Sequence, residues 1–432
     1  MAEYLNTPED YMRMVLALAR QGEGQVSPNP MVGCVVVKDG RVIAQGYHEK
    51  YGGFHAERNA LLQCRENTEG AELYVNLEPC CHQGKTPPCT DIILEKKIRK
   101  VYVGCLDSNP KVAGKGVRIL REHGVEVEVG ILGEECRTLN EVFFHYMEEN
   151  LPFVAMKYAM TLDGKIACES GDSRWVSGAE SRDYVQCLRN RYRGIMAGIG
   201  TVQMDDPLLS CRMEGGRNPV RILCDARLRI PLDSQIVRTA GEIETIVAWN
   251  AQAAGAFRAS RSIGDENCSQ NMVAGEHAKT VQETVDYLMG RGVTLLEIPL
   301  KGEEPSPERL SPEQQNAGQF SLGLQNAGTL SPELDLQQLL RQLGGRGIDS
   351  ILLEGGGTLN ASMLQENLVQ RVYAFVAPKL VAGAKAKSPV EGTGILRMKD
   401  AVELEDVEIS HLGKDICIMG RIRKERPCLR EL

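Results

Sequence analysis

The chain has 432 residues, about three times the ~150 residues at which one hydrophobic core usually closes, so we expect two domains and an additional segment. Hydrophobic residues (42%) and charged residues (25%) occur at globular frequencies, which excludes collagen-like, wholly disordered and membrane-embedded classes. The 50 Lys and Arg residues against 58 Asp and Glu give a net charge of −8, opposite to the basic footprint of a general nucleic-acid binder. No apolar run reaches the roughly 18 residues of a membrane helix.

The 14 cysteines are spread through a long chain, and residues 1–10 lack the apolar region of a secretory signal peptide. We therefore expect reduced thiols, some of them metal ligands, in a cytoplasmic protein.

The first third of the chain predicts alternating helices and strands. Thr7 as N-cap, Pro8 in the first turn and Gly22 as the stop signal bound a first helix. A valine-rich strand then turns through Asp39-Gly40, because Asp-Gly favours a two-residue hairpin turn. The expected elements after the first helix are strands at 31–37 and 42–44, a helix at 56–64, a strand at 72–77, a helix at 90–97 and a strand at 100–106. This alternation indicates an α/β layer fold.

A polar, acidic stretch before Pro152 places the expected domain boundary near residue 148, with one domain at 1–148 and another at 149–432. The second domain alternates again, which favours a second α/β fold. Its expected elements are strands at 153–160, 220–224, 243–249, 350–353 and 369–377, an apolar run at 195–198, and helices at 179–193 and 334–343. The pattern degrades between 251 and 333.

The stretch 301–333 differs from its surroundings. It carries several prolines, Leu-Ser-Pro-Glu recurs at 310 and 330, and Gln-Asn-Ala-Gly recurs at 315 and 325. Short polar repeats cannot bury a core, so we expect a low-complexity, disordered or loosely held surface insertion. A folded repeat that binds a partner is the alternative.

A group of metal-ligand residues surrounds the expected strand at 72–77. His55 and Glu57 open one helix, Cys80 follows the strand, and Cys89 opens the next helix. One imidazole and two thiolates suit Zn²⁺ and leave the fourth tetrahedral position for water, as a catalytic site requires. Glu57 is not needed as a ligand and can move the proton of that water. His-x-Glu followed by Pro-Cys and a second Cys is the signature of zinc deaminases, here with eight residues between the cysteines instead of two.

Two other interpretations of this group remain open. One is a closed structural zinc site with Cys81 or His82 as the fourth ligand, and the other is a buried cysteine cluster without metal. Adjacent cysteines rarely both reach one ion, and a closed site would leave Glu57 without a role. The long loop after Cys80 indicates additional substrate contacts, and Lys85 within it can meet a phosphate as a point charge.

The second domain lacks a complete Gly-x-Gly-x-x-Gly fingerprint of a Rossmann fold. Lys157 lies within the first predicted strand, and polar, glycine-containing patches follow several predicted strands, at 161–165, 171–175, 198–212 and 354–358. Glycine-rich turns between a strand and a helix leave backbone N–H groups available for phosphate, and 354–362 fits this geometry.

These motifs together resemble a known family. The segments Pro-Asn-Pro-Met-Val-Gly (28–33), Gly-Tyr-His (46–48), Gly-Phe-His-Ala-Glu (53–57) and Glu-Pro-Cys-Cys-His-Gln-Gly-Lys-Thr-Pro-Pro-Cys (78–89) are similar to the deaminase half of the bifunctional deaminase/reductases of riboflavin biosynthesis. The ordered patches of the second domain resemble its reductase half. The resemblance covers roughly 7–249 and 334–422. It implies an N-terminal cytidine-deaminase-like three-layer α/β/α domain and a C-terminal dihydrofolate-reductase-like α/β domain.

The resemblance also implies roles for single residues. Zinc would bind to His55, Cys80 and Cys89, with Glu57 as the catalytic proton shuttle. The implied deaminase substrate contacts are Asn29, His48, His82 and Lys85, of which the two histidines are alternatively structural. The implied NADPH contacts are Ala159, Trp175, Thr201, Asp205, Gly356, Gly357, Thr358, Leu359, Asn360, Ala361 and Ser362. The implied reductase substrate contacts are Lys157, Ser173, Arg189, Leu209, Arg212 and Glu354.

The implied function is zinc-dependent, hydrolytic deamination of 2,5-diamino-6-(5-phosphoribosylamino)pyrimidin-4(3H)-one, followed by NADPH-dependent reduction of 5-amino-6-(5-phosphoribosylamino)uracil to the ribitylamino product. The expected partners are this phosphorylated pyrimidine and further copies of the chain in a homo-oligomer, without nucleic acid or membrane. The alternatives are a nucleoside or tRNA-type zinc deaminase with an unrelated C-terminal domain, and a zinc-stabilised binding module without turnover.

Overall fold

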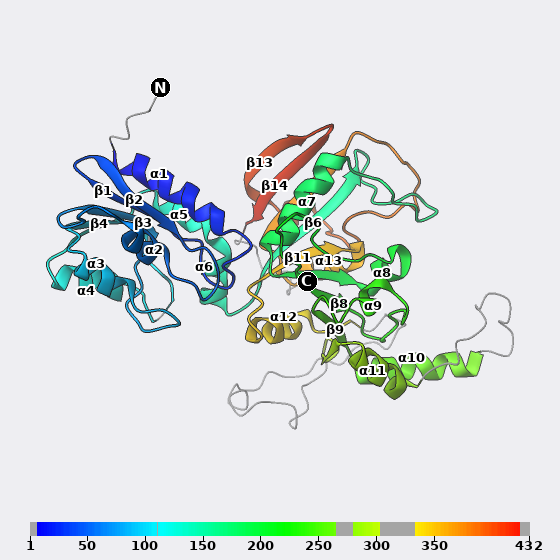
Figure 1. The fold of residues 1–432 in the computed structure, drawn as a ribbon. Helices are drawn as coiled ribbons and strands as arrows, with labels where there is room; N and C mark the ends of the chain where they lie inside the picture. The colour runs from blue at the N-terminus through cyan, green and yellow to red at the C-terminus, as the bar shows by residue number, and fades with distance from the viewer. Residues whose placement is uncertain (1–6, 110, 265–279, 303–332, 424–432) are drawn as a thin grey trace.

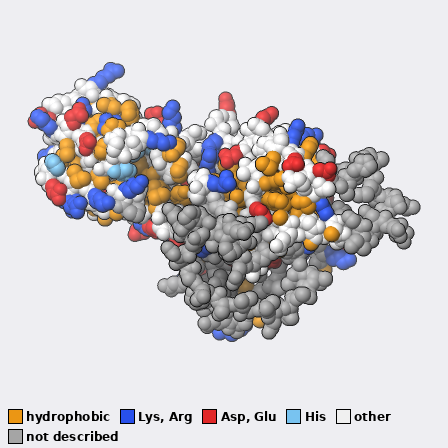
Figure 2. All heavy atoms as spheres, turned by 90° about the horizontal axis from the view of Figure 1, so that it is seen from below, with side chains coloured by type: hydrophobic (Ala, Val, Ile, Leu, Met, Phe, Trp, Pro, Cys, Tyr) orange, Lys and Arg blue, Asp and Glu red, His pale blue; other side chains and the backbone are white. Residues whose placement is uncertain are grey.

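The computed structural model describes residues 7–109, 111–264, 280–302 and 333–423, which form two α/β lobes around separate sheets (Figure 1). No helix within these ranges is long and apolar enough to cross a membrane. The expected domain boundary near residue 148 falls in the last turn of a helix at the junction of the lobes. On the face shown in Figure 2, acidic and basic side chains are interspersed over both lobes.

The N-terminal lobe contains a five-stranded sheet in the order β2-β1-β3-β4-β5. Its strands are β1 (Gly33–Lys38), β2 (Arg41–Tyr47), β3 (Glu72–Leu77), β4 (Lys100–Cys105) and β5 (Glu126–Val129), with β1 antiparallel to both neighbours and the others parallel. Its helices are α1 (Pro8–Ala19), α2 (Ala56–Gln63), α3 (Cys89–Glu95), α4 (Lys115–Glu122), α5 (Gly133–Leu139) and α6 (Glu141–Glu149), with a 3₁₀ turn η1 (Arg20–Gly22) after α1. Apolar side chains of α1 and α5 pack on one face of the sheet, and those of α2, α3, α4 and α6 on the other. This three-layer α/β/α arrangement confirms the predicted class.

Local signals account for the first elements. Thr7 accepts a hydrogen bond from the backbone of Asp10, whose carboxylate accepts one in return, so the capping box begins α1. Asp39 and Gly40 both have positive φ, 51° and 71°, as a tight hairpin turn between β1 and β2 requires. Strand β3 has the predicted bounds. The sequence analysis did not predict α4, β5, α5 or α6.

The C-terminal lobe contains a nine-stranded sheet in the order β10-β9-β8-β7-β11-β6-β12-β14-β13. Its strands are β6 (Phe153–Thr161), β7 (Gly194–Gly198), β8 (Val220–Cys224), β9 (Thr245–Trp249), β10 (Val293–Glu297), β11 (Ser350–Gly355), β12 (Arg371–Ala377), β13 (Leu404–Leu412) and β14 (Asp415–Ile422). The sheet is parallel except where β14 pairs with β12 and β13.

Helices cover both faces of this larger sheet. They are α7 (Ala179–Arg191), α8 (Ile199–Asp205), α9 (Gln235–Arg238), α10 (Ala251–Gly264), α11 (Val281–Gly290), α12 (Leu336–Gly345) and α13 (Gly357–Gln365), with a 3₁₀ turn η3 (Met398–Asp400). Apolar residues of α12 and α13 pack on one face, and those of α7 to α11 pack on the other. The lobe is therefore an α/β fold, as predicted.

The region 251–333 is partly more regular than the sequence indicated, because α10, α11 and β10 lie within it. Leu334 was expected in a helix, but it forms an isolated antiparallel bridge with Leu300, and Asp335 caps α12 instead. The predicted surface insertion at 301–333 lies almost wholly outside the described residues, so its expected disorder stays a prediction.

Candidate functional site

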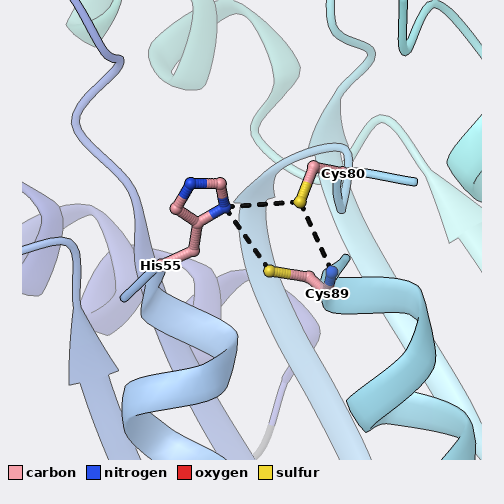
Figure 3. A group of neighbouring side chains, drawn as sticks. All are labelled: His55, Cys80 and Cys89. Atoms are coloured by element: carbon pink, nitrogen blue, oxygen red, sulfur yellow. Dashed lines mark hydrogen bonds between the residues drawn. The ribbon is translucent and has the colours of Figure 1, made fainter. Parts of the chain in front are cut away.

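Three potential metal ligands meet at the carboxyl end of β3. His55 is the residue before α2, Cys80 follows β3, and Cys89 is the first residue of α3. The Nδ1 atom of His55 lies 3.3 Å from Sγ of Cys80 and 3.5 Å from Sγ of Cys89. Figure 3 shows the ring of His55 presenting this nitrogen to both sulfurs. The three donor atoms lie within 4.8 Å of one another, so one ion could contact all of them.

The donor set fits zinc better than a harder cation, because it combines one imidazole nitrogen with two sulfurs. The hydrogen bond with Cys89 and the nearby His55 ring lower the pKa of Cys80, whereas the hydrogen bond with Cys80 and burial raise that of Cys89. One thiolate is thus already favoured. Among the described residues, neither Cys81 nor His82 joins the group, and Cys81 instead donates to the carbonyl of Lys111 at 3.8 Å.

Glu57 lies in the first turn of α2, two residues beyond His55. Its side chain is buried, and its Oε2 atom has no hydrogen-bond partner among the described residues. Burial raises the pKa of Glu57 to about 7, and the neighbouring Cys80 adds to this effect. A buried carboxyl group that titrates near neutrality can both accept and donate a proton.

The other predicted deaminase residues share one cavity of about 400 Å³ with this group, which is lined by Asn29, His48, His82 and Lys85 as well as by His55, Glu57 and Cys80. Asn29 and His48 are joined by a hydrogen bond of 3.1 Å between Nδ2 and Nε2. The ammonium of Lys85 lies 3.9 Å from the centre of the Tyr51 ring. The structure therefore brings the predicted deaminase residues together.

The sequence analysis missed part of this cavity. Asp107, Asn109 and Lys111 also line it, and they follow directly after β4. Burial raises the pKa of Asp107 to about 6. Because β3 and β4 are parallel neighbours, their carboxyl ends meet at one edge of the sheet, so the polar run after the predicted strand was an available signal.

A second cavity, of about 300 Å³, lies in the C-terminal lobe around a buried charge cluster. Arg189 on α7 donates from Nε and Nη2 to the two carboxylate oxygens of Glu354 on β11, at 2.7 and 2.9 Å. Lys157 on β6 lies 4.0 Å from the same carboxylate, and burial lowers its pKa. Predicted residues that line this cavity are Lys157, Ala159, Ser173, Trp175, Arg189, Thr201, Asp205, Arg212, Glu354, Gly356, Gly357 and Asn360.

An adjoining cavity of about 450 Å³ shares Ser173, Thr201, Asp205, Gly356 and Gly357 with the second and adds Thr358, Leu359 and Ser362. It surrounds the start of α13. A Cβ atom on Gly357 would lie 2.7 Å from the backbone carbonyl oxygen of Ser388, so only glycine lets the neighbouring loop approach this helix end. Helix N-termini bind phosphate, and this one begins at a cavity large enough for part of a dinucleotide.

Sequence analysis missed three residues of this cavity, of which the two arginines fit a phosphorylated cofactor. Ala226, Arg227 and Arg229 follow β8 and line the adjoining cavity. The Nε atom of Arg229 is buried and has no hydrogen-bond partner in the described part of the chain, although Asp225 lies 3.9 Å away. The residues present thus fit NADPH, whose additional phosphate calls for cations.

Two predicted contacts do not line these cavities. Leu209 is buried in the apolar cluster beneath α8 and α9, and Ala361 is buried within α13. Both roles remain predictions from the resemblance. Cys89 does not line the deaminase cavity, because its side chain is almost fully buried.

The fold and the two sites define a class of enzyme in which a zinc-dependent pyrimidine deaminase domain is joined to an NADPH-dependent reductase domain. Two family models match the corresponding parts of the chain. The cytidine and deoxycytidylate deaminase zinc-binding region matches residues 5–105, and the RibD C-terminal domain matches 152–287 and 303–418.

Similar proteins span nearly the whole chain. The riboflavin biosynthesis protein RibD of Actinobacillus pleuropneumoniae is 43% identical over 412 residues, which is 95% of this chain and 94% of the relative. The Escherichia coli K12 protein of the same name is 32% identical over 423 residues, 95% and 98% of the two chains. The chain therefore belongs to the RibD family of bifunctional riboflavin biosynthesis enzymes.

Two solved structures agree with this assignment. Acinetobacter baumannii RibD has a TM-score of 0.75 and 31% identity, covering 96% of this chain and 99% of that one. A diaminohydroxyphosphoribosylaminopyrimidine deaminase/5-amino-6-(5-phosphoribosylamino)uracil reductase from Thermotoga maritima has a TM-score of 0.71 and 33% identity, with the same coverage.

Proposed function

We propose that this chain carries out two successive reactions of riboflavin synthesis. The N-terminal lobe deaminates 2,5-diamino-6-(5-phosphoribosylamino)pyrimidin-4(3H)-one by hydrolysis. The C-terminal lobe then reduces 5-amino-6-(5-phosphoribosylamino)uracil to the ribitylamino product with NADPH. The buried carboxyl of Glu57, whose Oε2 atom has no hydrogen-bond partner among the described residues, lies beside the three clustered ligands and carries the first part of the proposal. The name of the Thermotoga relative supports the substrates.

In the deaminase site, His55, Cys80 and Cys89 would hold Zn²⁺, which when bound supplies a Lewis acid that makes water a stronger nucleophile. Oε2 of Glu57 takes the proton of the attacking water and passes it to the departing ammonia. Burial raises the pKa of Glu57, which favours a carboxyl group that can hold the proton between the two transfers. The joined side chains of Asn29 and His48 orient the pyrimidine ring in the cavity.

In the reductase site, the backbone at the start of α13 and the cations after β8 bind cofactor phosphates, and NADPH when bound supplies the hydride. Arg189 and Lys157 keep Glu354 ionised beside the cavity, because together they overcome the effect of burial and hold its pKa at about 2. Arg212 is exposed at the same cavity and offers a cation for the ribose phosphate of the substrate.

The first test is Glu57→Gln in the full chain. We expect ammonia release to fall by about 10²- to 10⁴-fold, the usual effect of losing a general acid and base. Zinc content and reduction of the uracil substrate should stay at the wild-type level, because glutamine has nearly the same shape and the reductase site lies in the other lobe. Glu66→Gln, at an exposed carboxylate paired with Arg41, is the matched control. Unchanged ammonia release in Glu57→Gln would defeat the mechanism.

The second test supplies wild-type protein with the diaminopyrimidine substrate and NADPH. Nicotinamide absorbance should fall after deaminated product has formed. Accumulation of that product without loss of NADPH would contradict the reductase assignment. The match of residues 152–287 and 303–418 to the RibD C-terminal domain disfavours the alternative of an unrelated C-terminal domain.

The domain bounds, cellular location and oligomeric state complete the proposal. We assign the deaminase domain to 1–148 and the reductase domain to 149–432, and we expect a cytoplasmic homo-oligomer that acts on small phosphorylated pyrimidines. Sedimentation analysis tests the oligomeric state, and a single mass equal to one chain would contradict it.

A further inference from the structure

Residues 23–31, here called the interdomain loop, connect η1 to β1 and lie where the two lobes meet. The loop belongs to the deaminase lobe by sequence, yet one side of it is bound by the reductase lobe. Its other side reaches two residues of the deaminase cavity. The motif at 28–33 predicted the contact with the deaminase cavity but not the contact with the reductase lobe.

The reductase lobe holds the first half of the loop at three points. The hydroxyl of Ser27 donates to Oδ2 of Asp349 at 2.8 Å, and Nε of Arg217 donates to the carbonyl of Gly24 at 3.0 Å. Glu23 forms an ion pair of 3.4 Å with Arg191. Asp349 is buried and directly precedes β11, so its position is fixed by the centre of the reductase sheet.

The close approach at Gly24 shows how tightly the loop is seated on the reductase lobe. Gly24 has a φ of 78°, and a Cβ atom there would lie 2.8 Å from the backbone carbonyl oxygen of Asn190, which cannot rotate away. Any other residue would therefore have to push the loop away from α7.

The same loop reaches the deaminase cavity by two routes. Asn29 contacts His48 through the 3.1 Å hydrogen bond already described. Further back, the carbonyl of Gln25 accepts a hydrogen bond of 3.0 Å from the backbone N–H of Tyr51, whose ring lies under the ammonium of Lys85. Both routes end at side chains that we propose to contact the substrate.

The path from the reductase anchor to these contacts is short and well fixed. Asn29 and Asp349 line one small cavity of about 50 Å³ between the lobes. Beyond Asn29, the side chain of Asn140 binds both the N–H and the C=O of Met31, at 2.8 and 2.9 Å. The loop is thus fixed at its far end, and the backbone N–H of Asn29 donates to the carbonyl of Val26 at 2.9 Å, so the first half of the loop also helps to place Asn29.

We propose that Ser27 is a positioning residue through which Asp349 of the reductase lobe sets the substrate contacts Asn29 and Lys85 of the deaminase lobe. This inference rests on the proposed deamination of the phosphorylated diaminopyrimidine. Without the anchor, the loop populates positions in which these two side chains no longer face the substrate together. Substrate binding then weakens. Proton transfer by Glu57 is unaffected, because Glu57 lies on α2, which is separate from the loop.

The test compares Ser27→Ala, Ser27→Thr and Tyr146→Phe in the full chain. Ser27→Ala removes the hydroxyl, Ser27→Thr keeps it, and Tyr146→Phe removes a different contact between the lobes, the 2.8 Å hydrogen bond from Tyr146 to the carbonyl of Gly344. For Ser27→Ala we expect the KM for the diaminopyrimidine to rise about five- to tenfold, as loss of one partly buried hydrogen bond to a carboxylate predicts, with kcat within about twofold. The other two variants should keep the wild-type KM.

Two further measurements separate positioning from general damage. Reduction of supplied uracil substrate should be unchanged in Ser27→Ala, and the amide of Tyr51 should exchange with deuterium faster, because its acceptor Gln25 lies in the released loop. An unchanged KM in Ser27→Ala, or an equal rise in Tyr146→Phe, overturns the inference. Failure of the wild-type protein to release ammonia overturns the proposed function instead.

Discussion

Two buried carboxyl groups of the reductase lobe, Glu354 and Asp225, show how strongly the nearest cation affects the pKa of a buried acid. Glu354 receives two short hydrogen bonds from Arg189, so its pKa is held at about 2 despite burial. Asp225 accepts one hydrogen bond from the backbone of Ile230 at 2.8 Å, and Arg229 lies 3.9 Å from its second oxygen. Burial therefore prevails at Asp225 and raises its pKa to about 6. The first group is stable as an anion, whereas the second costs free energy when it ionises.

This difference predicts a pH-dependent effect of Asp225→Asn. The folded-state pKa of Asp225 lies above its usual value of 3.8, so the folded chain binds more protons than the unfolded chain between about pH 4 and 6. The free energy of unfolding of the wild type then falls as pH rises through this window. The neutral variant escapes this loss, and we expect it to be more stable by about 1–3 kcal/mol above pH 6 and nearly equal to the wild type at pH 4.

Tryptophan fluorescence during urea unfolding measures this effect in the correct lobe, because both tryptophans, Trp175 and Trp249, lie in the reductase lobe. The measurement is made at pH 4 and at pH 7.5. Asp233→Asn, at an exposed carboxylate of the same lobe, is the control and should leave the urea midpoint unchanged at both pH values. A stabilisation by Asp225→Asn that is as large at pH 4 as at pH 7.5 would contradict the explanation by burial.

At the scale of elements, the deaminase site depends on how closely two helices approach the sheet. A Cβ atom on Gly33 of β1 would lie 2.2 Å from the carbonyl oxygen of Val15 on α1. A Cβ atom on Gly46 of β2 would lie 2.6 Å from the amide nitrogen of Ala60 on α2. Both neighbours are backbone atoms, which cannot rotate away. Glycine at these positions lets a helix lie directly on a strand.

Gly46→Ala should therefore move α2, the helix that carries His55 and Glu57 at its start. We expect a destabilisation of about 1–3 kcal/mol, lower zinc content and weaker deamination, with reduction of the uracil substrate retained. Gly241→Ala is the matched control, because no atom lies within 4 Å of the position of its Cβ. Full zinc content in Gly46→Ala would show that α2 tolerates the shift.

The local signals and the exposure of the elements explain which of them could be predicted from the sequence. The ligands and Glu57 were predictable because each lies at the end of a local element with a clear signal, such as Pro88 before Cys89. Strand β13 was missed because much of it is exposed, with Val407 and Ile409 on the surface, so its hydrophobic pattern does not follow a core. Asp107 and Arg229 were missed because their loops reach the sites only through the order of the strands.

At the scale of the molecule, the chain on either side of residues 303–332 belongs to the same reductase lobe and lies close together. The backbone N–H of Lys301 donates to the carbonyl of Glu333 at 2.8 Å, and that of Asp335 donates to Pro299 at 2.9 Å. The residues before and after 303–332 are therefore paired like the two arms of a hairpin. Glu333 and Leu334 also line the cavity of about 450 Å³ at the start of α13, so the residues after the segment belong to the cofactor site.

This pairing predicts the result of deleting residues 303–329. Residues 330–332 would then connect Gly302 to Glu333, a distance that three residues can bridge because the flanking chains are already hydrogen-bonded. We expect both activities to stay within about twofold of the wild type, because loop length affects stability only weakly. A deletion of 303–335 is the control: it also removes two cavity residues and the N-cap Asp335 of α12, and it should raise the KM for NADPH. Loss of either activity in the shorter deletion would show that the repeats contribute to catalysis or folding rather than forming a dispensable insertion.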